Sequence, residues 1–287
     1  MVKHLGVVGA GTMGSVIAQM AALSGIETSL YDINETVLRR ALERIKSDLK
    51  SAVDQGRLSE IQSSEALGKI HQRTHLAELG HSEFVIEAVI EDLRIKKDLL
   101  KHLEADTKPT TILASTTSSL FISAVASATR HPEKVIGLHF MNPSGSPALV
   151  EVVRGQETSV ETVQRSLDLM AQIKKSAIVV NDTPGFIVHR LLQSFHGEAL
   201  RILGEQVADC AQIDRLMKAE GGLTVGPFES MDNLGLESCL SVTRSLYEQT
   251  SGEPRYRPHS ILRRMVESGM LGRKSGRGFY SYEDSKK

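Results

Sequence analysis

Apolar residues in the first 33 positions follow two strand patterns on either side of a helical one. Residues 4–10 (HLGVVGA) and 27–33 (ETSLYDI) are short apolar runs typical of buried strands. Residues 15–25 (SVIAQMAALSG) repeat apolar side chains at helical spacing. A glycine-rich turn joins the first strand to this helix, so the chain is predicted to begin with a strand–turn–helix–strand unit.

The turn reads Gly9-Ala10-Gly11-Thr12-Met13-Gly14, and Asp32 follows in the second strand. Gly9 allows a tight turn, Gly11 lets backbone amides approach a pyrophosphate, and Gly14 allows the helix to pack against the strand. The helix N-terminus offers N–H groups and a positive dipole end to the phosphates. Asp32 is placed to accept hydrogen bonds from ribose hydroxyls and to repel a 2′-phosphate, which favours NAD over NADP. FAD sites use the same fingerprint, so the pattern alone leaves FAD as an alternative.

A charged stretch follows at residues 36–75, with helical periodicity and a break at Gln55-Gly56. We expect a helical arm of two helices here, longer than a simple crossover needs. Basic residues gather on its first half: Arg39, Arg40, Arg44, Lys46 and Lys50. Such residues are typical of a solvated helix face, and as a group they also offer a surface for a polyphosphate ligand.

Strand patterns return at residues 84–89, 111–116, 134–140, 148–153 and 176–181, and helical patterns lie at 91–106, 118–130 and 159–173. Alternating strands and helices predict a mostly parallel sheet covered by helices on both faces. The two strands around HFMNP have no helix between them, so they are expected to return as an antiparallel pair that forms an edge of the sheet.

The pattern changes at Asn181-Asp182-Thr183-Pro184-Gly185, where Pro184 disfavours a helical residue before it. Beyond it the patterns are helical, at 186–206, 211–221, 231–250 and 258–269, with at most a short strand at 278–282. We therefore predict an α/β Rossmann-type doubly wound sheet with a helical arm in residues 1–183. An all-α domain is predicted in residues 184–287.

Composition narrows the functions that this chain can have. The 34 Lys and Arg against 35 Asp and Glu give a net charge of −1, which argues against a nucleic-acid binder that works by global charge. No apolar window approaches a membrane span, and the N-terminus has no signal or transit pattern, so a cytoplasmic protein is expected. The cysteines and histidines show no metal-ligand spacing, and no metal is expected.

Two ionisable residues stand inside apolar runs, His139 in VIGLHF and Glu151 in ALVEVV. Burying either alone is costly, because its charged form loses its water. If the chain returns as an antiparallel pair, the Glu151 carboxylate can accept a hydrogen bond from one imidazole nitrogen and leave the other to face a substrate. By residue type alone, a structural His–Glu pair and a catalytic one fit equally well.

Eight blocks of the sequence, in order, resemble the motifs of the L-3-hydroxyacyl-CoA dehydrogenase family. They are GAGTMG, VIEAVIED, ILASTTSSL, GLHFMNP, LVEVV, NDTPGFIVHRLL, GPFESMDNLGLE and YRPHSILRRMVESGMLGRKSGRGFYSY. The resemblance spans essentially the whole chain and is strongest to the short bacterial 3-hydroxybutyryl-CoA dehydrogenases. It implies NAD-linked oxidation of a short-chain (3S)-hydroxyacyl-CoA and a homodimer formed by the helical domain.

The resemblance also implies roles for individual residues. His139 matches the general base, Glu151 matches the residue that orients it, and Ser118 matches the serine that binds the reacting oxygen of the substrate. The cofactor-contacting positions of the family match the following residues: Glu91, Lys96, Asn142, again Ser118, and the glycine turn with Thr12 and Met13.

Two positions depart from the family pattern. Thr116 replaces the Asn of the usual NTSS block, and His189 replaces the Asn of GFIVNRLL, a fourth active-site residue. His189 can donate a hydrogen bond as the amide does, but it is bulkier and can become charged. The loop after HFMNP also differs, which bears on the acyl group that fits.

Two alternatives follow from these observations. One is a dehydrogenase of related architecture that acts on a hydroxyacid without CoA. The other is a dinucleotide-binding paralogue that has lost catalysis, which the changes at Thr116 and His189 would permit.

Overall fold

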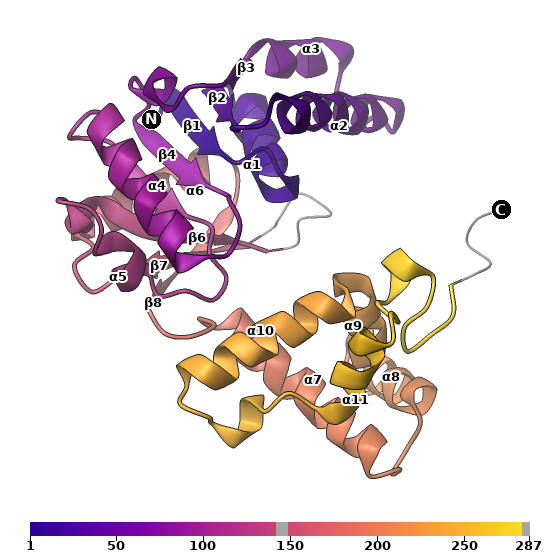
Figure 1. The fold of residues 1–287 in the computed structure, drawn as a ribbon. Helices are drawn as coiled ribbons and strands as arrows, with labels where there is room; N and C mark the ends of the chain where they lie inside the picture. Colours follow the sequence, from indigo (N-terminus) through magenta and orange to yellow (C-terminus); the bar gives the residue numbers. More distant parts are fainter. Residues whose placement is uncertain (142–148, 283–287) are drawn as a thin grey trace. The chain divides into compact units, whose positions relative to one another are not determined.

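The structure is a computed structural model that describes residues 1–141 and 149–282. The chain divides into two units, Met1–Thr183 and Pro184–Lys287. A β-sheet with helices forms the first unit, and helices form the second (Figure 1). Each unit has its own hydrophobic core. The predicted fold class, a Rossmann-type sheet followed by a helical domain, is confirmed.

Among the described residues, the strands of the first unit form one eight-stranded sheet in the order β3-β2-β1-β4-β5-β6-β7-β8. Their bounds are β1 His4–Val8, β2 Glu27–Tyr31, β3 Ile70–Arg73, β4 Phe84–Glu87, β5 Ile112–Ser115, β6 Val135–Phe140, β7 Leu149–Arg154 and β8 Ser176–Asn181. Neighbouring strands are parallel except β6 and β7, which are antiparallel. The antiparallel return predicted from the missing helix is therefore confirmed, although β8 and not β7 forms the edge.

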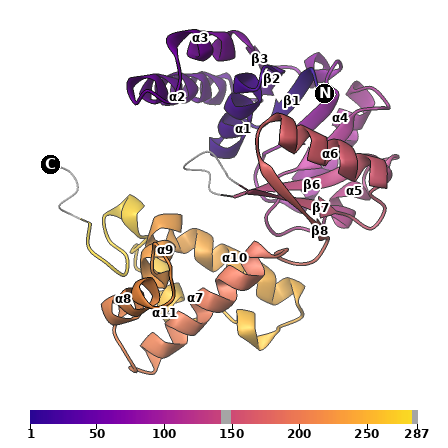
Figure 2. The same cartoon turned by 180° about the vertical axis from the view of Figure 1, so that it is seen from behind.

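The helices of this unit are α1 Thr12–Leu23, α2 Glu35–Asp54, α3 Glu60–Gly68, α4 Leu93–Asp106, α5 Ile122–Ala126 and α6 Val160–Gln172. Short 3-10 turns lie at η1 Leu76–Leu79 and η2 Pro132–Lys134. Helices α4 and α5 cover one face of the sheet (Figure 1), and α6 covers the other (Figure 2). The sheet is thus buried on both faces, as apolar parallel strands require.

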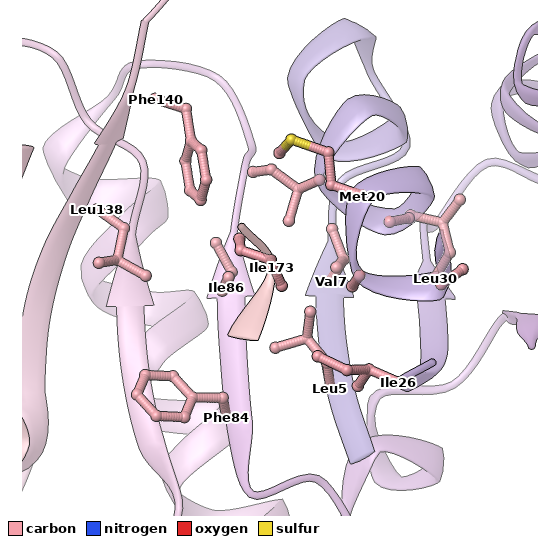
Figure 3. Close-up of a cluster of buried hydrophobic side chains, with 14 of the residues drawn as sticks. Leu5, Val7, Met20, Ile26, Leu30, Phe84, Ile86, Leu138, Phe140 and Ile173 are labelled. Atoms are coloured by element: carbon pink, nitrogen blue, oxygen red, sulfur yellow. The ribbon is translucent and has the colours of Figure 1, made fainter. Parts of the chain in front are cut away.

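Side chains on alternate strand positions divide between these two faces. Leu5, Val7, Ile86, Leu138 and Phe140 point into one core (Figure 3). Buried side chains of α1 and α6 belong to the same core. The positions between them face the opposite side. There a Cβ on Gly137 would lie 2.7 Å from the side chain of Ile122 in α5, so α5 packs directly against β6. His139 and Glu151, which alternate with the core residues, belong to this α5 side of the sheet.

One sequence prediction about the arm is wrong at its end. The helical arm was expected over 36–75, but its second helix ends at Gly68 and residues 70–73 form β3 beside β2. Gly56 lies between the two helices with a φ of 68°, as the predicted break requires. The strand IHQR buries Ile70 but leaves its other residues partly or fully exposed, so it lacks the apolar run of an interior strand.

The second unit contains α7 Val188–Gly204, α8 Cys210–Ala219, α9 Pro227–Leu234, α10 Leu236–Gln249 and α11 Ser260–Glu267, with turns at η3 Pro254–Tyr256 and η4 Arg273–Ser275. Residues 231–250, predicted as one helix, are divided by Gly235 with a φ of 89°. Residues 278–282 contribute only an isolated bridge, not a strand. They are held instead by buried Asp232, which accepts hydrogen bonds from the amides of Phe279 and Tyr280.

Candidate active site

The glycine turn forms between β1 and α1 as the sequence predicts. Gly9 has a φ of 98°, and a Cβ there would lie 2.6 Å from the carbonyl oxygen of Ala88. A Cβ on Gly14 would lie 1.8 Å from the carbonyl oxygen of Gly9, so only glycine lets α1 approach the turn. A Cβ on Gly11 would meet no atom within 4 Å, and no side chain caps the first turn of α1. The open space and the uncapped amides fit the phosphates of a dinucleotide.

Asp32 lies directly after β2 and is tied to this turn. Its Oδ2 accepts a hydrogen bond of 2.9 Å from the Ala10 amide, and its Oδ1 accepts one of 3.0 Å from the Asn34 amide. The carboxylate remains partly exposed. An anion therefore stands at the carboxyl end of β2, beside the turn, where a dinucleotide fold places the acid that meets the ribose.

Arg44 of α2 reaches the same turn, a contact that the sequence did not reveal. Its guanidinium donates to Ser15 Oγ at 3.0 Å and to the carbonyl oxygens of Ala10 and Gly11 at 3.4 Å. The sequence places Arg44 among several basic residues of the arm, and nothing in the pattern distinguishes it from them. Its approach depends on the packing of α2 against α1.

His139 and Glu151 form a buried pair. They are direct partners in the register of β6 and β7, and the His139 Nδ1 atom lies 2.7 Å from Glu151 Oε2. The side chain of Glu151 is 0% exposed and that of His139 is 7% exposed. The predicted pairing of these two residues is confirmed by this geometry, and the antiparallel strands explain it because opposite residues share one face.

Glu87 forms a second buried ionic contact, at the carboxyl end of β4. Its carboxylate accepts from Lys96 Nζ at 2.6 and 3.0 Å and from Ser115 Oγ at 3.0 Å. Burial raises the pKa of Glu87, and the neighbouring Lys96 ammonium opposes that shift. The Lys96 side chain is only 1% exposed, so its ammonium is enclosed by the protein's own carboxylates. Its predicted contact with the cofactor stays a prediction.

Glu91 binds the turn that carries Ser118. Its Oε1 accepts from the hydroxyls of Thr117 and Ser119 and from the amides of Ser118 and Ser119, at 2.5 to 3.1 Å. Burial would raise the pKa of Glu91, but Lys96 and these hydrogen bonds together outweigh it and lower the pKa. Glu91 is thus held as an anion beside Ser118.

These residues lie at or beyond the carboxyl ends of the neighbouring strands β4, β5 and β6. Glu87 and Ser115 are partners in the β4–β5 register, and Ser115 pairs with Gly137, two positions before His139. The turn with Ser118 follows the last residue of β5, Ser115, on the same side of this register as His139. The carboxyl ends of the parallel strands are where open α/β sheets bind their ligands.

Two predicted site residues lie outside the described part of the first unit. Asn142 lies outside the described residues. His189 is the second residue of α7, in the second unit, and its Cβ lies 3.3 Å from the position that a Cβ on Gly185 would take. Their assigned roles stay predictions.

Metal and membrane features are missing from residues 1–141 and 149–282. In this part of the chain no cluster of His, Cys, Asp and Glu could hold a metal ion, and no helix has the length and apolarity to cross a bilayer. The cytoplasmic location stays a prediction.

Comparison with protein families finds two matches that together cover nearly the whole chain. Residues 4–183 match the family model of the 3-hydroxyacyl-CoA dehydrogenase NAD binding domain. Residues 185–282 match the model of the 3-hydroxyacyl-CoA dehydrogenase C-terminal domain.

Individual relatives agree with these matches. A probable 3-hydroxybutyryl-CoA dehydrogenase of Bacillus subtilis is 41% identical over 283 residues, covering 99% of this chain and 98% of the relative. The 3-hydroxybutyryl-CoA dehydrogenase of Bradyrhizobium diazoefficiens is 38% identical over 286 residues, covering 100% and 97%. The crystal structure of (S)-3-hydroxybutyryl-CoA dehydrogenase from Ralstonia eutropha superposes with a TM-score of 0.94 at 36% identity, covering 98% and 99% of the two chains. The chain therefore belongs to the 3-hydroxyacyl-CoA dehydrogenase family of NAD-dependent oxidoreductases.

Proposed function

We propose that the protein reversibly oxidises a short-chain (3S)-hydroxyacyl-CoA, such as 3-hydroxybutyryl-CoA, to the 3-oxoacyl-CoA with NAD. The observation that carries this proposal is the buried His139–Glu151 pair at the carboxyl end of the sheet. The names of the relatives, 3-hydroxybutyryl-CoA dehydrogenases at 36–41% identity over the full chain, support the substrate class.

His139 acts as the general base in this proposal. Its Nδ1 faces Glu151, so the opposite ring nitrogen, Nε2, takes the proton of the C3 hydroxyl. As that O–H bond breaks, the C3–O bond becomes a carbonyl, and the C3 hydrogen leaves with its electron pair. NAD supplies the acceptor for this hydride. Glu151 fixes the tautomer of the ring and stabilises the imidazolium that forms.

Ser118 binds the reacting oxygen. Its amide is held by Glu91, while its side chain makes no hydrogen bond within the described residues and is partly exposed. A hydroxyl at this place donates to the substrate oxygen and supports the charge that builds on it when the reaction runs toward the alcohol.

In this proposal the cofactor binds along the same row of strand ends, beginning at the ends of β1 and β2. The amides at the start of α1 receive the pyrophosphate, and Asp32 accepts hydrogen bonds from the adenosine ribose. Glu91, Ser118 and Asn142 complete the contacts toward the nicotinamide half. We further propose that basic residues of α2 receive the CoA phosphates.

The helical unit is proposed to form a homodimer. It exposes large apolar side chains, among them Leu191 at 69%, Val207 at 70% and Leu216 at 60%. Exposed large apolar side chains favour association with a second copy, because burial then removes them from water.

The proposed activity is tested by initial rates of NAD reduction with (3S)-hydroxyacyl-CoA substrates of increasing chain length. Free 3-hydroxybutyrate, the (3R)-thioester and NADP serve as controls. We expect turnover of the short-chain (3S)-thioester with NAD. Oxidation of the free acid alone would favour a hydroxyacid dehydrogenase, and NAD binding without any turnover would favour a paralogue that has lost catalysis.

A further inference from the structure

The turn from Thr117 to Leu120 is shaped by side chains and not by backbone pairing. The Thr117 amide donates to Ser115 Oγ, and the Leu120 amide donates to Thr117 Oγ1. The Ser118 amide donates to Glu91, and the Ser119 amide donates to Glu91 and to Thr117 Oγ1. Within residues 1–141 and 149–282 no backbone carbonyl accepts from these amides, so the shape of the turn depends on the side-chain oxygen atoms that accept from them.

Glu91 is the main hydrogen-bond acceptor for this turn. One of its oxygens, Oε1, accepts four hydrogen bonds from residues 117–119, two from amides and two from hydroxyls. Hydrogen bonds to a charged acceptor are about twice as strong as those between neutral groups. Losing this carboxylate therefore removes more of the turn's support than losing any single donor.

The chain alternates in burial across this segment. Ser115, Thr117 and Ser119 are buried and bonded toward the carboxylates of Glu87 and Glu91, while Thr116 and Ser118 are only partly buried. The alternation directs Ser118 away from the buried cluster. Fixing the hydroxyls on both sides of Ser118 thus also limits the directions that its own side chain can take.

Lys96 contacts the second carboxylate oxygen of Glu91, which does not bond to the turn. Its ammonium lies 3.5 Å from Glu91 Oε2 and 2.6 Å from Glu87 Oε1, and its side chain is 1% exposed. A buried ammonium between two carboxylates reduces the cost of holding both charged. Glu91 itself is 36% exposed, so it links this enclosed cluster to the surface where Ser118 lies.

We propose that Glu91, supported by Lys96, is a positioning residue for Ser118, because it orders the turn of residues 117–120 and so aims the hydroxyl that meets the substrate oxygen. The role of Ser118 in this proposal rests on the proposed function. The ordering of the turn does not, and it can be measured without substrate.

Amide hydrogen exchange of the segment 115–121 measures the order of the turn in the intact protein. Glu91→Gln removes the negative charge of the acceptor at constant side-chain size. Thr117→Val removes the hydroxyl that donates to Glu91 and accepts from two amides. Thr117→Ser keeps this hydroxyl as donor and acceptor. We expect exchange to rise by about tenfold in the first two variants and to stay at the wild-type rate in Thr117→Ser. Wild-type protection in both Glu91→Gln and Thr117→Val would overturn the proposal.

A double-mutant cycle with Ser118→Ala measures whether Glu91 acts through Ser118. We expect Glu91→Gln to lower kcat by about a hundredfold in the wild-type background and by less than about threefold in the Ser118→Ala background. Equal losses in both backgrounds would show that Glu91 acts independently of Ser118 and would overturn the proposal.

The two experiments separate this proposal from the proposed function. A wild-type protein without activity on hydroxyacyl-CoA would contradict the proposed function, and hydrogen exchange would still decide on the ordering of the turn. An active wild-type protein with a turn that Glu91→Gln leaves protected would contradict only the positioning role.

Discussion

Glu151 lies directly opposite His139 in the antiparallel β6–β7 pair, with its Oε2 2.7 Å from the imidazole Nδ1. The pair is buried and belongs to the face of the sheet that α5 covers. In this arrangement the carboxylate can stabilise the His139 imidazolium that forms transiently during a reaction, because little water competes for either group.

Glu151→Gln should lower kcat by about ten- to a hundredfold, because an amide holds the ring but does not stabilise its positive form. The acid limb of the pH–rate profile should move to lower pH, since the protonated ring loses its counter-charge. Kinetics across pH checks this. Glu133→Gln is a matched control, because Glu133 lies 3.1 Å from His131 in a more exposed His–Glu pair. A profile unchanged by Glu151→Gln would remove Glu151 as the orienting residue.

Asp32→Ala should weaken NAD binding by about tenfold and reduce the ratio by which the protein binds NAD more tightly than NADP. The variant loses the ribose contact and also the charge that repels a 2′-phosphate. Titration of both cofactors measures the two effects, and Asp54→Ala, at an exposed carboxylate in the last turn of α2, is the control. A preference that stays the same after Asp32→Ala would refute the ribose contact.

Gly11→Ala and Gly14→Ala should separate cofactor binding from stability. A methyl at Gly11 meets no protein atom within 4 Å, and its φ of −66° suits alanine, so the fold should be unaffected while NAD affinity falls. A methyl at Gly14 would collide with the Gly9 carbonyl at 1.8 Å, so this variant should lose stability. Urea denaturation and NAD titration of both variants check the contrast. Unchanged NAD affinity in Gly11→Ala would contradict the assigned phosphate site.

His196 should make the protein less stable as the pH falls below neutrality. It is buried in α7, neither ring nitrogen has a partner among the described residues, and burial lowers the pKa of His196 to about 4. Between its unfolded value of 6.5 and this folded value, the unfolded chain binds the proton and the folded chain does not. The free energy of unfolding therefore has its full value, as far as His196 is concerned, above pH 6.5. It decreases as the pH falls, by about 2 kcal/mol at pH 5.

Urea denaturation at pH 7 and pH 5 tests this contribution. His196→Leu should reduce the loss of stability between the two pH values, and His102→Leu, at an exposed histidine, should not. An equal pH dependence in wild type and His196→Leu would show that another group is responsible.

Much of this structure could be predicted from the sequence, because its strands and helices have regular apolar periods. Gly9 and Gly14 indicated a turn that only glycine can form, and the missing helix between two strands indicated the antiparallel pair. That pair brings His139 and Glu151 together, so a short-range pattern was enough to find them.

Other features depend on contacts between distant residues. The strand IHQR was missed because its hydrogen bonds to β2, and not its apolar content, make it a strand. Lys96 was indicated only by resemblance, as a cofactor contact, and the pattern of its helix does not show that Glu87 and Glu91 enclose its ammonium. Gly235 divides a helical pattern by its positive φ, which the spacing of apolar residues does not show.

The most direct measurement compares kcat and NADH affinity in His139→Ala, with His131→Ala as the control at an exposed histidine. If His139 is the general base, kcat for the (3S)-hydroxyacyl-CoA should fall by about a hundred- to ten-thousandfold, while the dissociation constant of NADH stays within about twofold of wild type. Near-normal turnover, or a loss of NADH affinity as large as the loss of kcat, would contradict that role.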